Sequence, residues 1–537
     1  MQRAIAAEPP RADNWLFRVA SRVKTDAPST ADWIGTFATT LLLVFSFPNF
    51  DFPFLAWFAL VPLLFVVSRR PSPLRAFILG WAFGSTFFYA TCYWLTYSMI
   101  HYGGLRPVVA YLLLVPGAIV IGLFPGLFTL VLAVAVKRWG RLAVLSAPFL
   151  WAAFEWVRLG VTGQLWNALG YSQAYHPLLI QSANWGGVYA VSFLIVLVNS
   201  AVGFVVLKPE RRTVVTALAI AAVVGVVVMG SRPHATRTPD SSSVHVIALQ
   251  PNVPMTIVKT EDQLKALRER HLTLSKQALA KLPNDNLPRL VIWPESPMNF
   301  TYASDTAFQQ WVGRFATENH TSLIFNSLEP AGPSAYYNSA LMINEEGRLI
   351  SQYDKIRLMP FGEYVPLPQW LPGASLITAI VGEFTPGDKY TMMPVGDYHV
   401  GVFICIESAY PWIARRLTNK GADVLINISN DGYLGPTAVM RQHLANAIFR
   451  AVENGIPMLR VTNSGLSAEI SETGNIEEQT VAFHEDVRVW TLRRSKLTST
   501  FYTRHGDLFV YACTGITVLV LFVSVFSLNR RSFRQKR

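Results

Sequence analysis

The sequence predicts a polytopic α-helical membrane bundle of about eight spans together with an extramembrane α/β domain. The 537-residue chain is 51% hydrophobic and has a mean hydropathy of +0.30, which is too long and too apolar for one soluble domain. Apolar stretches of the membrane-helix type fill its first 230 residues and return near its end. Between them, short β-branched runs alternate with helical patterns, which is typical of sheets covered by helices.

Eight apolar stretches are candidate spans. The first two are short for crossing a bilayer, but they come as a pair, so an error in both would leave the topology of the later spans unchanged. The stretches are Trp33 to Pro48, Phe54 to Ser68, Leu74 to Met99, Pro107 to Val136, Leu142 to Val161, Trp185 to Leu207, Thr213 to Gly230 and Leu508 to Leu528.

Basic residues alternate between the connections of these stretches. Lys and Arg precede the first span, follow the last, and cluster between spans two and three, four and five, and six and seven. The connections around Phe50, His101 and Gln173 are nearly free of them. Because short connections rich in Lys and Arg stay in the cytoplasm, both termini are predicted to be cytoplasmic, and the long segment after span seven lies on the outer side.

The net charge of +12 does not indicate nucleic-acid binding. From Ser231 to His505 there are 25 Lys and Arg against 26 Asp and Glu, so the basic surplus belongs to the membrane part. Five parts are expected: a cytoplasmic N-terminal segment (1–32), spans one to seven (33–230), the outer α/β domain (231–505), span eight (506–528) and a basic cytoplasmic tail (529–537). The first 32 residues lack an apolar core, so no cleavable signal peptide is expected.

The outer α/β domain is predicted to alternate strands and helices. Strands are expected at Val244 to Leu249, Leu290 to Trp293, Ser322 to Asn326, Ala340 to Asn344, His399 to Ile404 and Val424 to Ile428. Helices are expected at Glu261 to Lys281, at Asp305 to Glu318, after Ser408 and at Arg441 to Glu453.

Three residues of the kinds used in covalent acyl transfer each follow an apolar run of this domain. Glu295 ends one run, Lys355 lies in a polar turn, and Cys405 directly follows a β-branched run. They can supply a base, a partner for an oxyanion and a nucleophile. Cys92 and Cys513 fall inside predicted spans, so Cys405 has no obvious disulfide partner.

A thiol is mostly protonated at neutral pH because its ordinary pKa is about 8.5. Glu295 is predicted to take the proton of Cys405, and Lys355 to hold positive charge beside the developing oxyanion. The helix predicted after Ser408 would add backbone N–H donors. Each residue also has a structural interpretation, as a core cysteine, a capping glutamate or a surface lysine. Their combination in one domain favours the catalytic interpretation.

These residues and their neighbours resemble the Glu-Lys-Cys signature of the nitrilase superfamily, which implies an αββα sandwich. With spans on both sides, the chain resembles the bacterial apolipoprotein N-acyltransferase family from about Trp33 to Leu528. It departs from the family at Ile406, where an aromatic residue often follows the cysteine. The matching motifs are Trp293-Pro294-Glu295, Lys355 with Pro360 to Pro366, Cys405-Ile406-Glu407, Glu155 to Arg158, Trp166 to Gln173, Tyr337 to Ser339 and Asn430 to Thr437.

The resemblance implies an enzyme of the bacterial inner membrane whose periplasmic domain performs the last step of lipoprotein maturation. Cys405 would attack an ester of a phospholipid, and Glu295 would shuttle the proton. The N-terminal amine of an S-diacylglyceryl-cysteine apolipoprotein would then take the acyl chain from the thioester. Such a ping-pong reaction needs no coenzyme and no metal.

The same resemblance implies supporting roles around the three catalytic residues. Glu363 and Glu407 would help to position Lys355 and the amine substrate, and Asn338 would support the pocket. A monomer is expected.

Two other functions stay open at this point. A membrane-tethered nitrilase-type amidase would use the same three residues with water as the second nucleophile. The other is not an enzyme but a transporter or an assembly scaffold whose outer domain has lost activity. Ionisable residues inside the spans would mark a transport path, but only Glu155 and Arg158 lie near a span end. Acyl transfer to a diacylglyceryl peptide separates the acyltransferase from the amidase. Normal lipoprotein acylation after replacement of Cys405 by Ser or Ala would support the scaffold.

Overall fold

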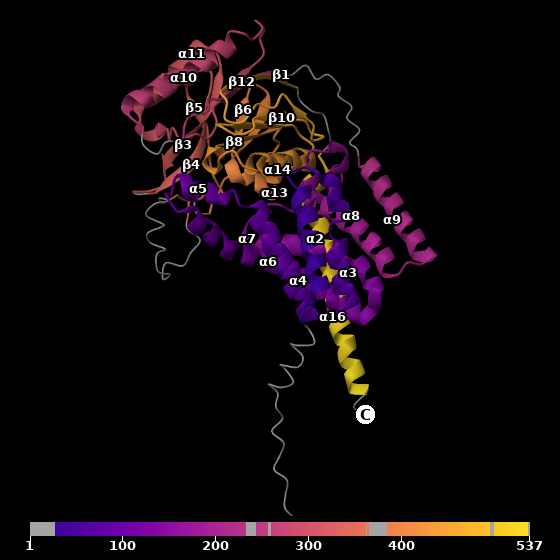
Figure 1. Cartoon of the computed structure of the whole chain (residues 1–537). Helices are drawn as coiled ribbons and strands as arrows, with labels where there is room; N and C mark the ends of the chain where they lie inside the picture. Colours follow the sequence, from indigo (N-terminus) through magenta and orange to yellow (C-terminus); the bar gives the residue numbers. More distant parts are fainter. Residues whose placement is uncertain are drawn as a thin grey trace, which may run out of the picture.

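The computed structural model describes residues 27–231, 243–255, 259–333, 335–360, 362–364, 384–493 and 499–534, the last eight by their backbone alone. The predicted linker after Ser231, most of the N-terminal segment, the end of the basic tail and part of the motif after Pro360 lie outside these residues. The described chain forms a helical bundle joined to a globular domain of two sheets (Figure 1).

Helices occupy all eight predicted apolar stretches. Local signals set where they begin: Ser29 and Asp32 form a capping box at the start of the first helix, and a proline starts the third and fourth. The helices are α2 (Thr30–Ser46), α3 (Val61–Arg69), α4 (Pro73–Thr91), α6 (Pro107–Trp139), α7 (Ala147–Thr162), α8 (Ala183–Leu207), α9 (Arg211–Gly230) and α16 (Leu508–Arg534).

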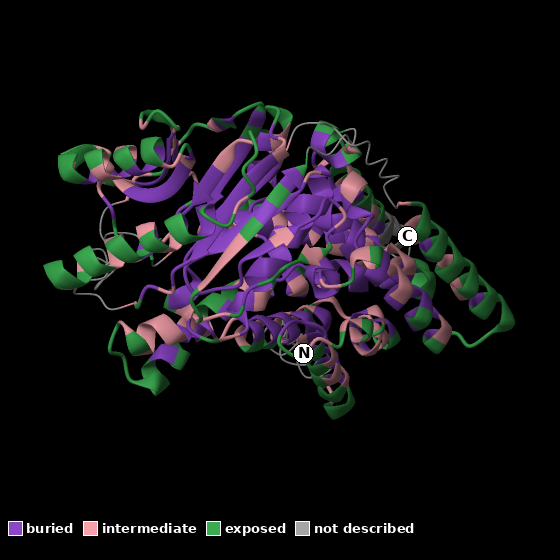
Figure 2. Ribbon diagram, turned by 90° about the horizontal axis from the view of Figure 1, so that it is seen from above, coloured by how far each residue is buried: buried purple, intermediate pink, exposed green. Residues whose placement is uncertain are grey.

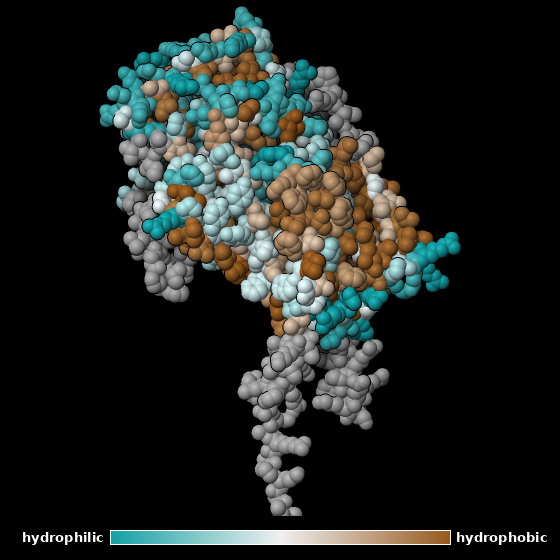
Figure 3. All heavy atoms as spheres, in the orientation of Figure 1, coloured by the Kyte–Doolittle hydropathy of each residue, from teal (hydrophilic) through white to brown (hydrophobic). Residues whose placement is uncertain are grey.

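By length and hydropathy, four segments of the described chain qualify as membrane-crossing helices. They are Pro107–Thr162, Ala183–Leu207, Arg211–Gly230 and Leu508–Phe526. Two further apolar helical segments, Thr30–Ser46 and Pro53–Arg69, are shorter. The expectation of eight spans is therefore supported only in part. Apolar surface gathers over the bundle and polar surface over the globular domain, as a membrane protein requires (Figure 3).

The third predicted stretch, Leu74 to Met99, is broken in the structure. α4 ends at Thr91, and the short helix α5 (Leu95–His101) follows it. The break has a tertiary cause, because the Gln442 side chain donates to the Thr91 carbonyl at 3.0 Å and accepts from the Trp94 indole at 3.0 Å. Hydropathy along the chain does not reveal a partner so distant in sequence.

Two six-stranded sheets form the globular domain, in the orders β12-β1-β2-β3-β4-β5 and β11-β10-β9-β8-β7-β6. Strands β1 to β3 are parallel, as are β7 to β9, and the remaining pairs are antiparallel. The first sheet contains β1 (Ser243–Gln250), β2 (Arg289–Ile292), β3 (Ser322–Pro330), β4 (Tyr336–Ile343), β5 (Leu349–Asp354) and β12 (Asp486–Arg493). The second contains β6 (Met392–Val395), β7 (Tyr398–Ile404), β8 (Val424–Ser429), β9 (Met458–Thr462), β10 (Ala468–Ile470) and β11 (Ile476–Glu477).

Helices cover the outer face of each sheet, so the layers run helix, sheet, sheet, helix (Figures 1 and 2). Helices α10 (Glu261–Leu279) and α11 (Thr306–Glu318) pack on the first sheet around a buried aromatic cluster. Helices α13 (Pro411–Asn419) and α14 (Val439–Asn454) pack on the second. The sheets themselves are the most buried part of the domain in Figure 2. These layers match the αββα sandwich that the sequence resemblance implies.

Six of the twelve strands in the described chain were not predicted, namely β5, β6 and β9 to β12. Their sequences are short or carry polar and charged side chains, so they lack a clear β period. β12 forms because it pairs along its whole length with β1, from Ser243 opposite Arg493 to Gln250 opposite Asp486. Such pairing between the two ends of a domain is a tertiary contact that local sequence does not encode.

Helix α14 joins the globular domain to the bundle. Near its start, the Gln442 side chain accepts hydrogen bonds from the indoles of Trp94 and Trp166 at 3.0 and 2.9 Å. Near its end, Glu453 Oε1 accepts from the backbone nitrogen of Val188 in α8 at 3.0 Å. Polar contacts at both ends of one buried helix hold the two parts of the chain in a defined register.

Candidate active site

The three predicted catalytic residues meet at one edge of the two sheets. Glu295 follows β2, Lys355 follows β5 and Cys405 follows β7. Lys355 Nζ lies 3.6 Å from Glu295 Oε1, and the charges of both residues act on the Cys405 thiol. β2 and β5 run in the same direction in the first sheet, so Glu295 and Lys355 follow strand ends at the same edge of that sheet. Cys405 follows the carboxyl end of β7 in the second sheet.

Lys355 is held between two carboxylates. Its Nζ lies 2.9 Å from Glu363 Oε1 and 3.6 Å from Glu295 Oε1, and its side chain is only 1% exposed. Burial alone would lower the pKa of Lys355, but the negative charges of Glu295 and Glu363 outweigh it and raise the pKa well above its usual value. Lys355 therefore supplies a permanent positive charge to the site.

Asn338 in β4 bridges the two carboxylates. Its Nδ2 donates to Glu295 Oε1 at 2.9 Å and to Glu363 Oε1 at 2.7 Å, and its Oδ1 accepts from Asn326 Nδ2 at 2.7 Å. The backbone carbonyl of Asn338 also accepts a hydrogen bond from the backbone nitrogen of Lys355 at 2.8 Å. The amide thus orients both acidic side chains around the ammonium group.

Cys405 lies at a sharp junction between a strand and a turn. Its φ of 53° is left-handed, and it begins a turn of 3-10 helix, η6 (Cys405–Ala409). The helix predicted after this turn begins at Pro411, as α13. Burial and the charge of Glu295 raise the pKa of Cys405, while Lys355 opposes them. The resting thiol is therefore protonated, and attack requires a base.

Glu407 lies behind the site and ties the turn of Cys405 to the turn that follows Lys355. It is fully buried, and its carboxylate is engaged by the protein itself. It accepts hydrogen bonds from Tyr353 Oη and from the backbone nitrogens of Ile356, Arg357 and Ile404, at 2.7 to 3.0 Å. The expectation that Glu407 also helps to position the amine substrate stays a prediction.

Glu407 is expected to make stability pH-dependent, because burial raises its pKa from 4.5 to about 7 against the opposing hydrogen bonds. A carboxyl group whose pKa is raised by folding stabilises the fold fully below its unfolded pKa, and this contribution is lost as the pH rises through the folded value. Relative to Glu407→Gln, the wild type should lose about 3 kcal/mol of unfolding free energy between about pH 4.5 and pH 8. Denaturant unfolding in detergent at several pH values measures the difference, and a difference that does not change with pH would contradict the assignment.

Asn430 also contacts the site, although it was not predicted to have a role there. It follows β8, and its backbone nitrogen donates to Glu295 Oε2 at 3.1 Å. The signal available in the sequence was the polar Asn430-Asp431-Gly432 directly after an apolar run. The carbonyl of Gly432 accepts a hydrogen bond from Tyr102 Oη at 3.4 Å, so this loop contacts the connection between α5 and α6.

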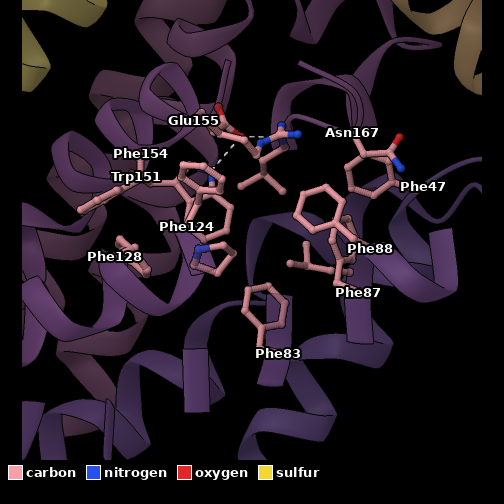
Figure 4. Close-up of a pocket in the computed structure, with 14 residues that line it drawn as sticks. Phe47, Phe83, Phe87, Phe88, Phe124, Phe128, Trp151, Phe154, Glu155 and Asn167 are labelled. Atoms are coloured by element: carbon pink, nitrogen blue, oxygen red, sulfur yellow. Dashed lines mark hydrogen bonds between the residues drawn. The ribbon is translucent and has the colours of Figure 1, made fainter. Parts of the chain in front are cut away.

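The two ionisable residues near a span end have structural partners. Glu155 Oε1 accepts from the backbone nitrogen of Leu169 at 2.7 Å and from the Trp151 indole at 2.9 Å, and Arg158 donates to the Trp166 carbonyl at 2.8 Å. They lie at an apolar pocket between α2, α4, α6 and α7 (Figure 4). The pocket is otherwise lined by Leu43, Phe47, Phe83, Phe87, Phe88, Phe124, Pro125, Phe128, Trp151, Phe154, Asn167 and Leu169.

The described residues contain no group of three His, Cys, Asp or Glu side chains arranged to hold a metal ion.

Comparison with known proteins agrees with this division of the chain. The family model for carbon-nitrogen hydrolases matches residues 248–502, which places the two-sheet domain in that class. The model for the apolipoprotein N-acyltransferase N-terminal domain matches residues 39–201 in the bundle. Among solved structures, Saccharomyces cerevisiae Nit3 of the nitrilase superfamily is 19% identical, with a TM-score of 0.36, and the match covers 48% of this chain and 91% of that one.

Full-length relatives define the family more narrowly. The apolipoprotein N-acyltransferase of Geobacter metallireducens is 32% identical over 510 residues, covering 92% of this chain and 95% of that protein. The one from Allorhizobium ampelinum is 31% identical over 463 residues, covering 82% of this chain and 85% of that protein. The chain belongs to the apolipoprotein N-acyltransferase family.

Proposed function

We propose that this protein transfers an acyl chain from a phospholipid to the N-terminal amine of an S-diacylglyceryl-cysteine apolipoprotein through a thioester on Cys405. The observation that carries the proposal is the cluster of Glu295, Lys355 and Cys405 in a chain whose full-length relatives are named apolipoprotein N-acyltransferase. In this proposal Glu295 is the proton carrier, Lys355 the cation that stabilises the oxyanion and Cys405 the nucleophile.

The first half-reaction acylates the enzyme. Glu295 removes the thiol proton of Cys405, and the sulfur attacks an ester carbonyl of the phospholipid. The tetrahedral oxyanion is stabilised by the ammonium group of Lys355. As the carbon–oxygen bond to glycerol breaks, Glu295 returns the proton to the leaving oxygen, and a lysophospholipid departs from the thioester.

The second half-reaction transfers the acyl chain to the acceptor. The free amine of the diacylglyceryl cysteine attacks the thioester carbonyl, so a carbon–nitrogen bond forms and the carbon–sulfur bond breaks. Glu295 takes the amine proton and delivers it to the departing sulfur of Cys405. The products are an amide and the original thiol, so the cycle needs no external energy source.

Both proposed substrates carry long acyl chains, and the molecule offers apolar surroundings for them. Moving an acyl chain out of a bilayer costs about 0.8 kcal/mol per CH₂, so a catalytic domain held at the membrane avoids that cost. The phenylalanine-rich pocket of Figure 4 lies within the bundle and has the lining that an acyl chain requires.

The proposed setting is the bacterial inner membrane, with eight spans, cytoplasmic termini, a periplasmic domain and a monomeric enzyme. The alternation of basic connections supports this orientation. The globular domain lies between α9 and α16, two of the helices that qualify as spans, so the whole domain is expected on one side of the membrane. Labelling of single cysteines by a membrane-impermeant maleimide in intact spheroplasts tests it: a cysteine placed at exposed Lys265 should react, and one placed at Arg138 should not.

Glu295→Gln tests the assignment of the base. The amide keeps the size of the side chain but cannot carry the proton, so thioester formation should slow by about 10²- to 10⁴-fold. Intact-mass analysis after incubation with phospholipid should show one acyl chain on the wild type, removable by hydroxylamine, and almost none on the variant. Equal rates of acylation in the two proteins would refute the role of Glu295.

A tethered amidase would use the same residues with water as the acceptor, so the products separate the alternatives. Supplying phospholipid and a diacylglyceryl peptide should yield the N-acylated peptide. Release of ammonia from small amides without acyl transfer would favour the amidase.

A further inference from the structure

The backbone carbonyl of Cys405 receives two side-chain hydrogen bonds. Asn427 Nδ2 donates to it from β8 at 3.2 Å, and His443 Nε2 donates to it from α14 at 3.0 Å. A carbonyl oxygen can only accept, so this ring nitrogen of His443 carries a proton. Both donors are buried. They act on Cys405, whose positive φ is unfavourable for every residue except glycine. Contacts with the surrounding structure therefore have to hold this backbone conformation.

The two donors are themselves fixed by one buried cation. The guanidinium of Arg460 in β9 donates to Asn427 Oδ1 and, at 2.6 Å, to Asp431 Oδ2. Asp431 Oδ1 lies 2.8 Å from His443 Nδ1 and accepts from Ser429 Oγ at 2.9 Å. The Arg460 guanidinium and the hydrogen bonds with Arg460 and His443 outweigh the effect of burial and hold the pKa of Asp431 well below its usual range. The network is therefore a closed ring that begins and ends at the Cys405 carbonyl.

Helix α14 carries this network to the membrane bundle. Gln442, next to His443, accepts from the indoles of Trp94 and Trp166 and donates to the carbonyls of Pro48 and Thr91 at 3.2 and 3.0 Å. The His443 ring also packs beside the Trp166 ring, with centroids 5.5 Å apart. The donor that holds the nucleophile is thus one residue from a side chain that makes four hydrogen bonds between the domain and the bundle.

We propose that His443 is a positioning residue that, together with Asn427, holds the left-handed backbone of Cys405 so that its sulfur points toward Glu295 and Lys355. Because His443 is anchored through Gln442 to the bundle helices, the position of the nucleophile is set relative to the membrane part of the protein. The inference rests on the proposed role of Cys405 as the nucleophile. His443 itself touches no reacting atom.

Two substitutions at His443 distinguish positioning from a purely structural role. In Gln, the terminal amide nitrogen can occupy the place of Nε2 and still donate to the Cys405 carbonyl. In Asn, the amide nitrogen reaches only the place of Nδ1, beside Asp431. Both remove the ring and half of its contacts, so a structural role predicts similar losses for His443→Asn and His443→Gln.

The experiment uses the full chain in detergent with phospholipid as the acyl donor. His443→Asn should form the Cys405 thioester about 10- to 100-fold more slowly than the wild type, with the KM for phospholipid unchanged. His443→Gln should stay within about threefold of the wild type. Equal rates in the two variants, or a change confined to KM, would overturn the proposal. If His443→Asn does not fold, Asn427→Asp replaces it, because this change places an acceptor against the same carbonyl. Asn427→Asp should likewise slow thioester formation without changing the KM for phospholipid.

A second readout keeps this inference separate from the proposed function. The rate at which iodoacetamide alkylates Cys405 depends on the orientation of the thiol and on its base, and needs no lipid. The same order of wild type, His443→Gln and His443→Asn is expected. If the wild type forms no thioester but this order holds, the proposed function fails and the positioning role stands. If the thioester forms but all three proteins alkylate at one rate, the positioning role fails.

Discussion

Cys405→Ser is expected to abolish acyl transfer, with a fall in rate on the order of 10⁴-fold or more. Serine keeps the shape of the turn, so the neighbours of residue 405 and its left-handed backbone should persist. The hydroxyl is a much weaker acid than the thiol, and the carboxylate of Glu295 cannot deprotonate it effectively. The variant should therefore bind both substrates and transfer nothing.

Cys513→Ser is the matched control for this prediction. Cys513 lies buried in α16 of the helical bundle, whereas Glu295 and Lys355 follow strands of the globular domain, so its replacement should leave the rate of transfer unchanged. The measurement is formation of N-acylated diacylglyceryl peptide, together with intact mass before and after hydroxylamine. If Cys405→Ser still transfers acyl chains at the wild-type rate, the thioester route is wrong.

Lys355→Met is expected to have the second-largest effect, because Lys355 supports both the chemistry and the fold. Its ammonium group pairs with Glu363 and Glu295, and its side chain is almost completely buried. Methionine keeps the length of the side chain but removes the charge that would stabilise the oxyanion, so transfer should fall by at least about 10³-fold. The loss of the counter-charge should also destabilise the protein by about 3 to 5 kcal/mol, because the Glu363 carboxylate is left buried without it.

The two consequences of Lys355→Met can be separated. Glu363→Gln combined with Lys355→Met removes the unpaired carboxylate, so it should recover part of the stability without recovering activity. Lys265→Met, on the exposed face of α10, is the control for loss of a lysine and should change neither quantity. Thermal unfolding followed by tryptophan fluorescence and the transfer assay measure the two effects. Wild-type stability in Lys355→Met would contradict the charge-pair interpretation.

The sequence predicted the parts of this fold that depend on local chemistry. Long apolar runs predicted the bundle helices, and short β-branched runs between helical patterns predicted the first half of the globular domain. Strand β12 and the end of α4 could not be predicted, because each depends on a partner far along the chain: β1 for the strand and Gln442 for the helix. The hydropathy of a segment carries no information about such partners.

The candidate site shows the same division. Glu295 and Cys405 were visible because each is a reactive side chain after an apolar run, and Lys355 because it is a lysine in a polar turn between such runs. Asn430 and His443 were not, because one acts through its backbone nitrogen and the other through a hydrogen bond to the Cys405 backbone. Nothing in the residue type of an asparagine after a strand or a histidine on a helix distinguishes these roles from ordinary capping or packing.

By itself, the sequence determined which segments are apolar enough for a membrane, where strands run out into loops and which reactive side chains stand there. Only the tertiary structure decided that Lys355 lies between two carboxylates, that the Glu407 carboxylate holds two backbone turns together, and that α14 links Cys405 to the bundle. The physical reason is that side-chain type and periodicity act over a few residues. Hydrogen bonds and charge pairs act over a few ångströms between residues that only the fold brings together.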